Sequence, residues 1–385
     1  MKTIFHFLLS EKIVADVIGN FEETESNNYF IFFEDISNRK STLPKPKNDF
    51  LVLNYKNSGI NDLIEKLQPD LLLLHSISFK FAKVALEIQS NLVIGWFPWG
   101  YDIYSLPKIR LTLYGKKTLN YLNAQSPFFY IKNKLIEYCL DYLPDSILKK
   151  LNLEYFRETL LLHKKISYFI SYIEEDFHLF SKYYPNTMKF IYSPFLTLDQ
   201  YLGNIKQPEL ITNTGNILIG NSASLESNYF DVIEELNVNK SKFSKASFVL
   251  NYGETFKNFK KDVQIEINKE LSVKAECITE FMDLKTYVEF LKGCNTAVFL
   301  HYRQQAMGNI ITLIYLGSRV YLSKHNPILH FFNSKGIKIN IFENEFEEFG
   351  TSDLSKEEKE ANRTNVIKIF SFQNSSHIYT NVLAL

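Results

Sequence analysis

The sequence predicts an α/β protein made of two Rossmann-like domains. The chain has 385 residues, which is more than one hydrophobic core usually supports. Short apolar runs alternate with helix-like stretches, as expected for buried parallel strands in βα units. This alternation stops at a polar stretch, residues 203–215, and then begins again. The polar stretch is therefore the predicted interdomain linker.

The first domain is expected to span residues 1–205. Its first apolar run, residues 4–9, is too short to cross a membrane and is followed at once by charged Glu11 and Lys12. We interpret this run as the first buried strand. Further strands are predicted at residues 51–53, 71–74, 92–95, 168–170 and 190–194.

A basic helical insertion is predicted within the first domain, at about residues 107–165. Residues 106–165 carry eleven Lys or Arg and five Asp or Glu. Aromatic rings lie between these charges, at Tyr114, Phe128, Phe129, Tyr130 and Tyr138. A surface of this composition favours peripheral contact with anionic lipid. The alternative is that the rings pack into the domain and the lysines are merely solvated.

The second domain is expected to span residues 216–385. Strands are predicted at residues 217–219, 246–250, 277–278, 297–300 and 320–322. The tail from residue 343 to residue 360 has eight acidic residues and two lysines. A charge run of this kind indicates a solvated helical face.

The composition excludes several classes of function. The 43 basic and 43 acidic side chains cancel, so nucleic acid is not an expected partner. The three cysteines, Cys139, Cys277 and Cys294, are far apart and fit a reducing cytoplasm rather than a metal or redox site. The sequence also lacks a phosphate-binding P-loop, a dinucleotide fingerprint and a nucleophile elbow.

Two segments of the second domain carry polar side chains where a strand leads into a helix. Gly220, Asn221 and Ser222 offer backbone N–H groups and a hydroxyl to an anion, unless they only cap the helix. Arg303 follows another strand and precedes an apolar helix. A guanidinium at a helix N-terminus suits a leaving nucleoside diphosphate. The alternative is a surface ion pair for Arg303, with Gln304 and Gln305 as helix caps.

The first domain contains two candidate catalytic bases. Asp102 follows a strand end in an aromatic, glycine-flanked turn at residues 95–104. Aromatic rings stack on sugars, and a carboxylate there can accept the proton of an acceptor hydroxyl. Asp102 is preferred over His75, which ends another strand, although helix capping and a buried structural histidine are the respective alternatives.

Four blocks in the same order resemble glycosyltransferase family 56. Residues 96–104 are similar to the family's W-x-x-W-G-x-D-x-Y, and residues 217–222 to its I-L-V-G-N-S. Residues 251–253 resemble its M-G-Y region, and residues 302–309 its A-R-Q-Q-G-I-G-T. The family comprises TDP-N-acetylfucosamine:lipid II N-acetylfucosaminyltransferases, also labelled 4-alpha-L-fucosyltransferases.

The resemblance implies a GT-B fold, in which two Rossmann-like domains face a central crevice. It also implies a glycosyltransferase that moves a 4-acetamido-4,6-dideoxyhexose or similar sugar from a dTDP-sugar to a polyprenyl-pyrophosphate-linked glycan. The enzyme would act peripherally at the cytoplasmic face of the bacterial inner membrane. The donor residues it implies are Gly220, Asn221, Ser222, Asn251, Tyr252, Gly253, Arg303, Gln304, Gln305, Gly308 and Asn309.

Neither a cofactor nor a metal ion is expected. No Asp-x-Asp pair, the usual metal-binding feature of GT-A glycosyltransferases, is present, so arginine and helix ends would neutralise the leaving group. The alternatives are another GT-B glycosyltransferase of capsule or protein-glycan synthesis, a sugar-nucleotide epimerase, and a non-catalytic scaffold of a polysaccharide assembly complex.

Overall fold

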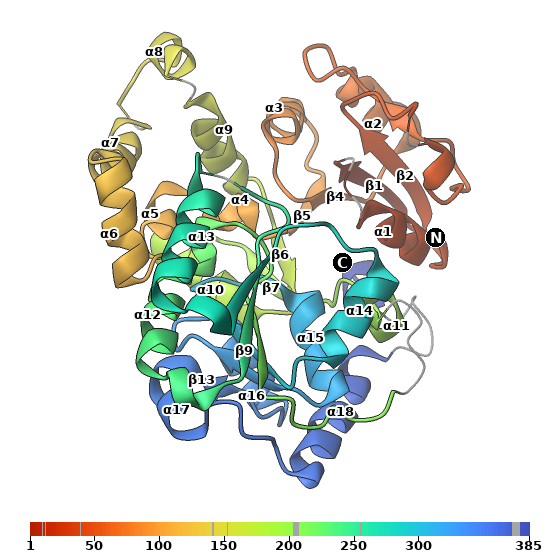
Figure 1. Cartoon of the computed structure of the whole chain (residues 1–385). Helices are drawn as coiled ribbons and strands as arrows, with labels where there is room; N and C mark the ends of the chain where they lie inside the picture. The colour runs from red at the N-terminus through yellow and green to blue at the C-terminus, as the bar shows by residue number, and fades with distance from the viewer. Residues whose placement is uncertain are drawn as a thin grey trace. The chain divides into compact units, whose positions relative to one another are not determined.

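The chain forms two compact units in a computed structural model (Figure 1). The structure describes residues 1–9, 11, 13–38, 40–140, 142–151, 153–202, 208–254, 256–371 and 378–385. Unit 1 comprises Met1–Arg110, Ile131–Thr197 and Phe372–Leu385, and unit 2 comprises Leu111–Tyr130 and Leu198–Ser371. Residues 203–207 of the predicted linker and the side chain of Tyr138 lie outside this description.

Unit 1 is built on a parallel sheet in the order β3-β2-β1-β4-β5-β6-β7. Its strands are β1 (Thr3–Leu8), β2 (Asn27–Phe32), β3 (Leu51–Val52), β4 (Leu71–His75), β5 (Val93–Phe97), β6 (Tyr168–Ser171) and β7 (Lys189–Tyr192). Its helices are α1 (Val14–Glu22), α2 (Ile60–Leu67), α3 (Phe79–Glu87), α4 (Tyr101–Tyr104), α5 (Pro107–Arg110), α7 (Phe129–Leu140), α8 (Asp145–Lys150), α9 (Glu154–His163), α10 (Glu174–Tyr183) and α19 (Thr380–Leu383). Helix α7 begins two residues before the unit boundary.

The C-terminal segment, residues 378–385, packs on the core of unit 1. Tyr379 stacks on Phe21, with ring centroids 3.8 Å apart. Ser193 Oγ donates to the carbonyl of Ile378 at 3.0 Å, and Asn381 Nδ2 donates to the carbonyl of Tyr192 at 2.9 Å. The end of the chain therefore belongs to unit 1, whereas the sequence-based boundary places it in the second domain.

Unit 2 has a second parallel sheet, in the order β10-β9-β8-β11-β12-β13. Its strands are β8 (Asn216–Ile219), β9 (Lys245–Val249), β10 (Ala275–Ile278), β11 (Thr296–Phe299), β12 (Arg319–Leu322) and β13 (Asn340–Ile341). Its helices are α6 (Lys116–Gln125), α11 (Leu198–Leu202), α12 (Tyr229–Val238), α13 (Phe259–Glu270), α14 (Leu284–Lys292), α15 (Met307–Leu316), α16 (Ile328–Ser334), α17 (Phe342–Phe349) and α18 (Lys356–Phe370).

All the predicted strands are present, and two further strands were not predicted. β2 begins with two asparagines, and β13 has only two residues, so neither shows an apolar run at its start. The acidic tail at residues 343–360 also differs from the single solvated helical face that was predicted. It divides into α17 and α18, and Phe342 and Phe346 of α17 are buried.

Helix α6 of the predicted insertion is bound to unit 2 by the side chain of Asp231. The Asp231 carboxylate accepts from Lys117 N at 2.8 Å, from Thr118 N at 3.0 Å and from Thr118 Oγ1 at 2.7 Å. It thereby occupies the N–H groups of Lys117 and Thr118 at the N-terminus of α6, where N–H groups have no partner within the helix. Gly115 leaves room for it, because a Cβ there would lie 2.5 Å from the carboxylate. Residues 111–130 therefore belong to unit 2, which differs from the sequence-based boundary.

We predict that Asp231→Ala loosens α6 without unfolding the rest of the chain. Loss of such a cap costs about 1–2 kcal/mol, so amide hydrogen exchange in α6 should become about tenfold faster. Exchange in β1 and β4 should not change. The control is Glu65→Ala, an exposed side chain on α2. Unchanged α6 exchange in Asp231→Ala would show that other contacts hold the helix.

Candidate functional site

Three loops of unit 2 meet at the carboxyl ends of neighbouring strands. β8 lies between β9 and β11 in the sheet. The chain passes from β8 to β9 on one side and later returns to β11 on the other side, so the strand order reverses at β8. In open parallel sheets this switch point is the usual place of ligand binding.

Gly220 begins the loop that follows β8. It has a φ of +64°, a conformation that residues with a side chain rarely adopt. A Cβ there would also lie 2.4 Å from Tyr229 Oη. The Tyr229 hydroxyl is buried at hydrogen-bond distance from the carbonyls of Ser222 and Val249, at 2.8 and 2.7 Å. Because Gly220 has no side chain, the loop can pass close to the ring of Tyr229, whose hydroxyl bonds to the loop at Ser222.

Gln305 connects the loop after β11 to the loop after β8. Its Nε2 donates to Asn221 Oδ1 at 2.9 Å and lies 3.3 Å from Ser222 Oγ. Asn221 Nδ2 in turn donates to Tyr252 Oη, 3.0 Å away in the loop after β9. The amide network Gln305–Asn221–Tyr252 therefore brings together predicted residues that lie up to 84 positions apart.

Arg303 lies half-buried in the loop between β11 and α15. Its Nε donates to the carbonyl of Gln304 at 3.5 Å. Ala306 ends the loop with a φ of +62°, and α15 begins at Met307. A guanidinium close in sequence to a helix N-terminus, beside amide and hydroxyl groups, is suited to an anion.

The remaining predicted residues of unit 2 take different positions. Gly253 has a φ of +77°, and Asn251 has a buried Oδ1; both follow β9. Gly308 and Asn309 lie in the first turn of α15. A Cβ on Gly308 would touch the ring of Tyr201 at 3.4 Å, and Asn309 hydrogen-bonds to Tyr287. These last two residues therefore contact neighbouring helices.

His301 is a residue of this site that was not predicted. It follows β11, is fully buried, and its Nε2 lies 3.4 Å from Ser227 Oγ. Burial, followed by the charge of Arg303, lowers the pKa of His301 to about 3, so the ring is neutral. Its position between the end of a predicted strand and Arg303 is the feature of the sequence that could have identified it as a site residue.

Asp102 in unit 1 is fully buried, and both of its oxygens are hydrogen-bonded. Oδ2 accepts from Trp96 Nε1 at 2.8 Å and from Ile77 N at 3.0 Å, and Oδ1 accepts from Trp99 N at 3.0 Å. Burial raises the pKa of Asp102 to about 6, while these hydrogen bonds oppose the shift. This geometry favours a role in holding the turn around Asp102.

His75 ends a chain of buried polar groups that crosses three strands. Asn28 Oδ1 accepts from Ser26 Oγ at 3.0 Å and lies 3.0 Å from His6 Nε2, which must therefore carry the proton. His6 Nδ1 then accepts from His75 Nε2–H at 3.1 Å. The parallel register places His6 beside Leu73 on β4, so His75, two residues on, shares its face.

The hydrogen-bond network leaves His75 Nδ1 unprotonated. This nitrogen is buried, and among the described residues it has no hydrogen-bond partner. Burial, followed by the effect of His6, lowers the pKa of His75 well below 6.5, so the ring is neutral at pH 7. The sequence-based preference for Asp102 over His75 as the base stays a prediction. The structure adds that Asp102 has both oxygens hydrogen-bonded, whereas His75 Nδ1 has no hydrogen-bond partner among the described residues.

The fold is similar to those of solved glycosyltransferases. A glycosyltransferase from Rickettsia africae is 14% identical with a TM-score of 0.60, over 100% of this chain and 97% of that chain. The sucrose-phosphate synthase of Thermosynechococcus elongatus is 8% identical with a TM-score of 0.62, over 100% of both chains. Anabaena HepE, solved in complex with UDP and glucose, is 11% identical with a TM-score of 0.61, over 100% of both chains.

A comparison with curated protein sequences found no match. Residues 147–384, more than half of the chain, match the family described as 4-alpha-L-fucosyltransferase, glycosyl transferase group 56. Three of the four resembling blocks, at residues 217–222, 251–253 and 302–309, lie within this match. With its two parallel α/β units of GT-B type, the chain is a glycosyltransferase that belongs to glycosyl transferase group 56.

Proposed function

We propose that the chain transfers a deoxyamino sugar from a dTDP-sugar to a polyprenyl-pyrophosphate-linked glycan in bacterial surface polysaccharide synthesis. The sugar is a 4-acetamido-4,6-dideoxyhexose or a close relative. Membership of the 4-alpha-L-fucosyltransferase family supports a 6-deoxyhexose, and the acetamido group is the part that the resemblance of the four blocks implies. The observation that carries a nucleotide-sugar donor is the amide network Gln305–Asn221–Tyr252 beside Arg303, at the switch point of unit 2.

The leaving diphosphate is stabilised by Arg303 and the backbone N–H groups near Gly220. Negative charge grows on the phosphate oxygen as the bond to the anomeric carbon breaks, and fixed donors act most strongly on charge that develops in the transition state. We propose that these groups act without a metal ion or other cofactor, since the sequence has no Asp-x-Asp pair.

The donor proposal predicts the response to nucleotides. dTDP at 100 times its dissociation constant should stabilise the folded chain by about 2.7 kcal/mol, which differential scanning fluorimetry detects as a raised midpoint. Arg303→Ala should lower turnover by about 100-fold, the scale of one lost electrostatic donor, and chelation by EDTA should not.

Arg303→Lys is the matched variant for this prediction. It keeps the charge and loses the planar fork that matches a diphosphate, so its turnover should fall between those of wild type and Arg303→Ala. A larger midpoint shift with UDP than with dTDP would contradict the thymidine donor. Wild-type turnover in a folded Arg303→Ala would remove Arg303 from the site.

The acceptor hydroxyl needs a group that takes its proton. In the proposed step the hydroxyl oxygen bonds to the anomeric carbon, the carbon–oxygen bond to the diphosphate breaks, and the proton passes to His75 Nδ1. The chain from Asn28 through His6 supports this assignment, because it leaves that nitrogen unprotonated. Asp102 then acts as a positioning residue, because Trp96, Ile77 and Trp99 already donate to its oxygens.

We therefore predict opposite effects for two variants. His75→Asn should lower kcat about 100-fold or more, the contribution of a general base, with an unchanged dissociation constant for dTDP. Asp102→Asn should lower the unfolding midpoint and keep kcat within about tenfold, because an amide cannot accept all three N–H groups. The reverse pattern would restore Asp102 as the base.

The pH dependence of stability provides a further check on Asp102. Its folded pKa of about 6 lies above the ordinary value of 3.8, so the folded chain binds this proton more tightly than the unfolded chain does. The resulting stabilisation is complete below pH 3.8 and is lost as the pH rises through about 6. Wild type should therefore lose stability relative to Asp102→Asn over this range.

A peripheral membrane contact is proposed for the surface of α7 to α9, where apolar and basic side chains are exposed together. This α7–α9 surface is defined by the exposed apolar residues Ile131, Leu135, Tyr142, Ile147, Leu151 and Leu161 and by the exposed lysines Lys132, Lys134, Lys149 and Lys150. Such a surface gains from burial of apolar groups at the lipid interface and from attraction to anionic lipid. Among the described residues no helix is long and apolar enough to cross a membrane.

We predict that the chain sediments with vesicles that contain phosphatidylglycerol and less with vesicles of phosphatidylcholine alone. Replacing Lys132, Lys134, Lys149 and Lys150 by Glu should weaken the binding by about tenfold or more, and so should added salt. The control is Lys116→Glu on α6 of unit 2. Wild-type protein that stays in the supernatant at low salt would contradict the membrane contact.

A further inference from the structure

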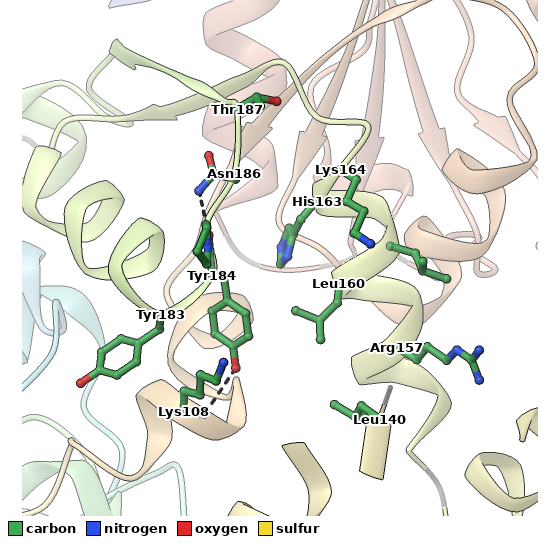
Figure 2. Close-up of a pocket in the computed structure, with 12 residues that line it drawn as sticks. Lys108, Leu140, Arg157, Leu160, His163, Lys164, Tyr183, Tyr184, Asn186 and Thr187 are labelled. Atoms are coloured by element: carbon green, nitrogen blue, oxygen red, sulfur yellow. Dashed lines mark hydrogen bonds between the residues drawn. The ribbon is translucent and has the colours of Figure 1, made fainter. Parts of the chain in front are cut away.

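Unit 1 contains a cavity of about 510 Å³ that the proposed reaction does not use. It lies among α5, the end of α7, α9 and the segment of residues 183–187 that leads into β7. Figure 2 shows the side chains of Lys108, Leu160, His163 and Tyr184 gathered around the same space. Most segments that line the cavity lead into β6 or β7. His75 is instead the last residue of β4, and Asp102 follows β5, so neither belongs to the lining.

The lining carries positive charge. Lys108, Arg157 and Lys164 are among the described lining residues, and none of those is a carboxylate. Lys108 Nζ lies 5.4 Å from the centroid of the Tyr184 ring. Arg157 extends away from Tyr184 in Figure 2, and its Nη1 donates to the carbonyl of Leu143 at 3.1 Å. Lys108 and Lys164 therefore add two positive charges to the lining.

His163 contributes a buried polar ring to the same wall. Its exposed fraction is 5%, and neither ring nitrogen has a hydrogen-bond partner among the described residues. The ring packs on Trp96 and Phe180, with centroids 4.9 and 4.7 Å away. Burying a polar group without a hydrogen-bond partner costs free energy. An acceptor oxygen of a bound ligand would be such a partner for the His163 N–H. Burial lowers the pKa of His163 to about 3, so the neutral ring offers one N–H.

Apolar side chains also line the cavity. Leu140, Leu160 and Leu161 line the cavity, and Leu161 is also 44% exposed on the α7–α9 surface. The cavity thus has basic and apolar walls, and its apolar wall is continuous with an exposed apolar surface. A ligand that fits both parts has an anionic head and a hydrocarbon chain.

We propose that this cavity binds the phosphate of a lipid, with its oxygens near Lys108, Lys164 and His163 and the first carbons of its chain against Leu160 and Leu161. The site is separate from the residues proposed for transfer. It depends on the proposed function only for the membrane surface through which a lipid would arrive.

The test is binding of short-chain lipids to the full chain, below the concentration at which they form micelles. Trp96 contacts His163, so tryptophan fluorescence reports on the cavity, and calorimetry measures the dissociation constant. Dihexanoylphosphatidic acid should bind at least about tenfold more tightly than dihexanoylphosphatidylcholine, which has the same chains and a cationic choline group. It should also bind at least about tenfold more tightly than inorganic phosphate, which has no chain.

Substitutions at the cavity locate the site. Lys108→Gln and Lys164→Gln should each weaken binding of the phosphatidic acid about tenfold, the effect expected for one lost charged hydrogen bond. Lys66→Gln, at an exposed lysine on α2, should leave it unchanged. Variants are compared only where circular dichroism and the unfolding midpoint match wild type, and Lys164→Gln is the more conservative test because Lys164 is exposed.

Three outcomes would overturn the proposal. Equal binding of the two lipids would mean that the cavity does not select the net negative charge of the head group. Equal binding of inorganic phosphate and phosphatidic acid would mean a phosphate site without a lipid. Unchanged binding in both lysine variants would place the lipid elsewhere. Failure of the transferase proposal is distinguishable, because an inactive chain that still binds phosphatidic acid in this way contradicts only that proposal.

Discussion

Parallel strand pairing is the constraint on which both candidate sites depend. In a parallel sheet every strand runs the same way, so all the loops that follow strands lie along one edge. In unit 2 this brings Gly220, Tyr252 and Gln305 together from three separate loops. In unit 1 the same rule places His75 at the end of β4 and the turn of Asp102 after β5. The chemistry of each unit therefore follows from its strand order.

Buried polar groups distinguish two kinds of residue in these sites. Asp102 and Asn221 have their polar atoms occupied by neighbours, and such complete networks make a backbone segment rigid. His75, His163 and His301 each keep at least one buried ring nitrogen without a hydrogen-bond partner in the described part of the chain. Burying such a nitrogen without a hydrogen bond costs free energy. A ligand or a reacting group that bonds to the nitrogen would offset this cost, so these three histidines are the candidate contact positions.

The chain passes between the two units four times, and two of the segments that these crossings delimit are held by contacts described above. Residues 111–130 belong to unit 2, where Asp231 binds the start of α6. The C-terminal segment belongs to unit 1, where Tyr379 stacks on Phe21. Each of these two segments is held by a few specific contacts. A carboxylate at a helix N-terminus contributes to holding residues 111–130, and a stacked ring pair together with two hydrogen bonds contributes to holding the C-terminal segment.

The sequence by itself determined the two series of βα units, because short apolar runs bounded by polar residues encode buried parallel strands locally. It also identified Asn221, Arg303 and Gln305 as candidate donor-binding residues. Each lies in a polar segment that follows a predicted strand, and these segments resemble the family's blocks in the same order. Only the tertiary structure decided that residues 111–130 join unit 2 and that both oxygens of Asp102 are occupied. The pairing of His6 with His75 across 69 positions likewise depends on strand register. Register and long-range hydrogen bonds arise from packing between elements, which the local pattern of residues does not encode.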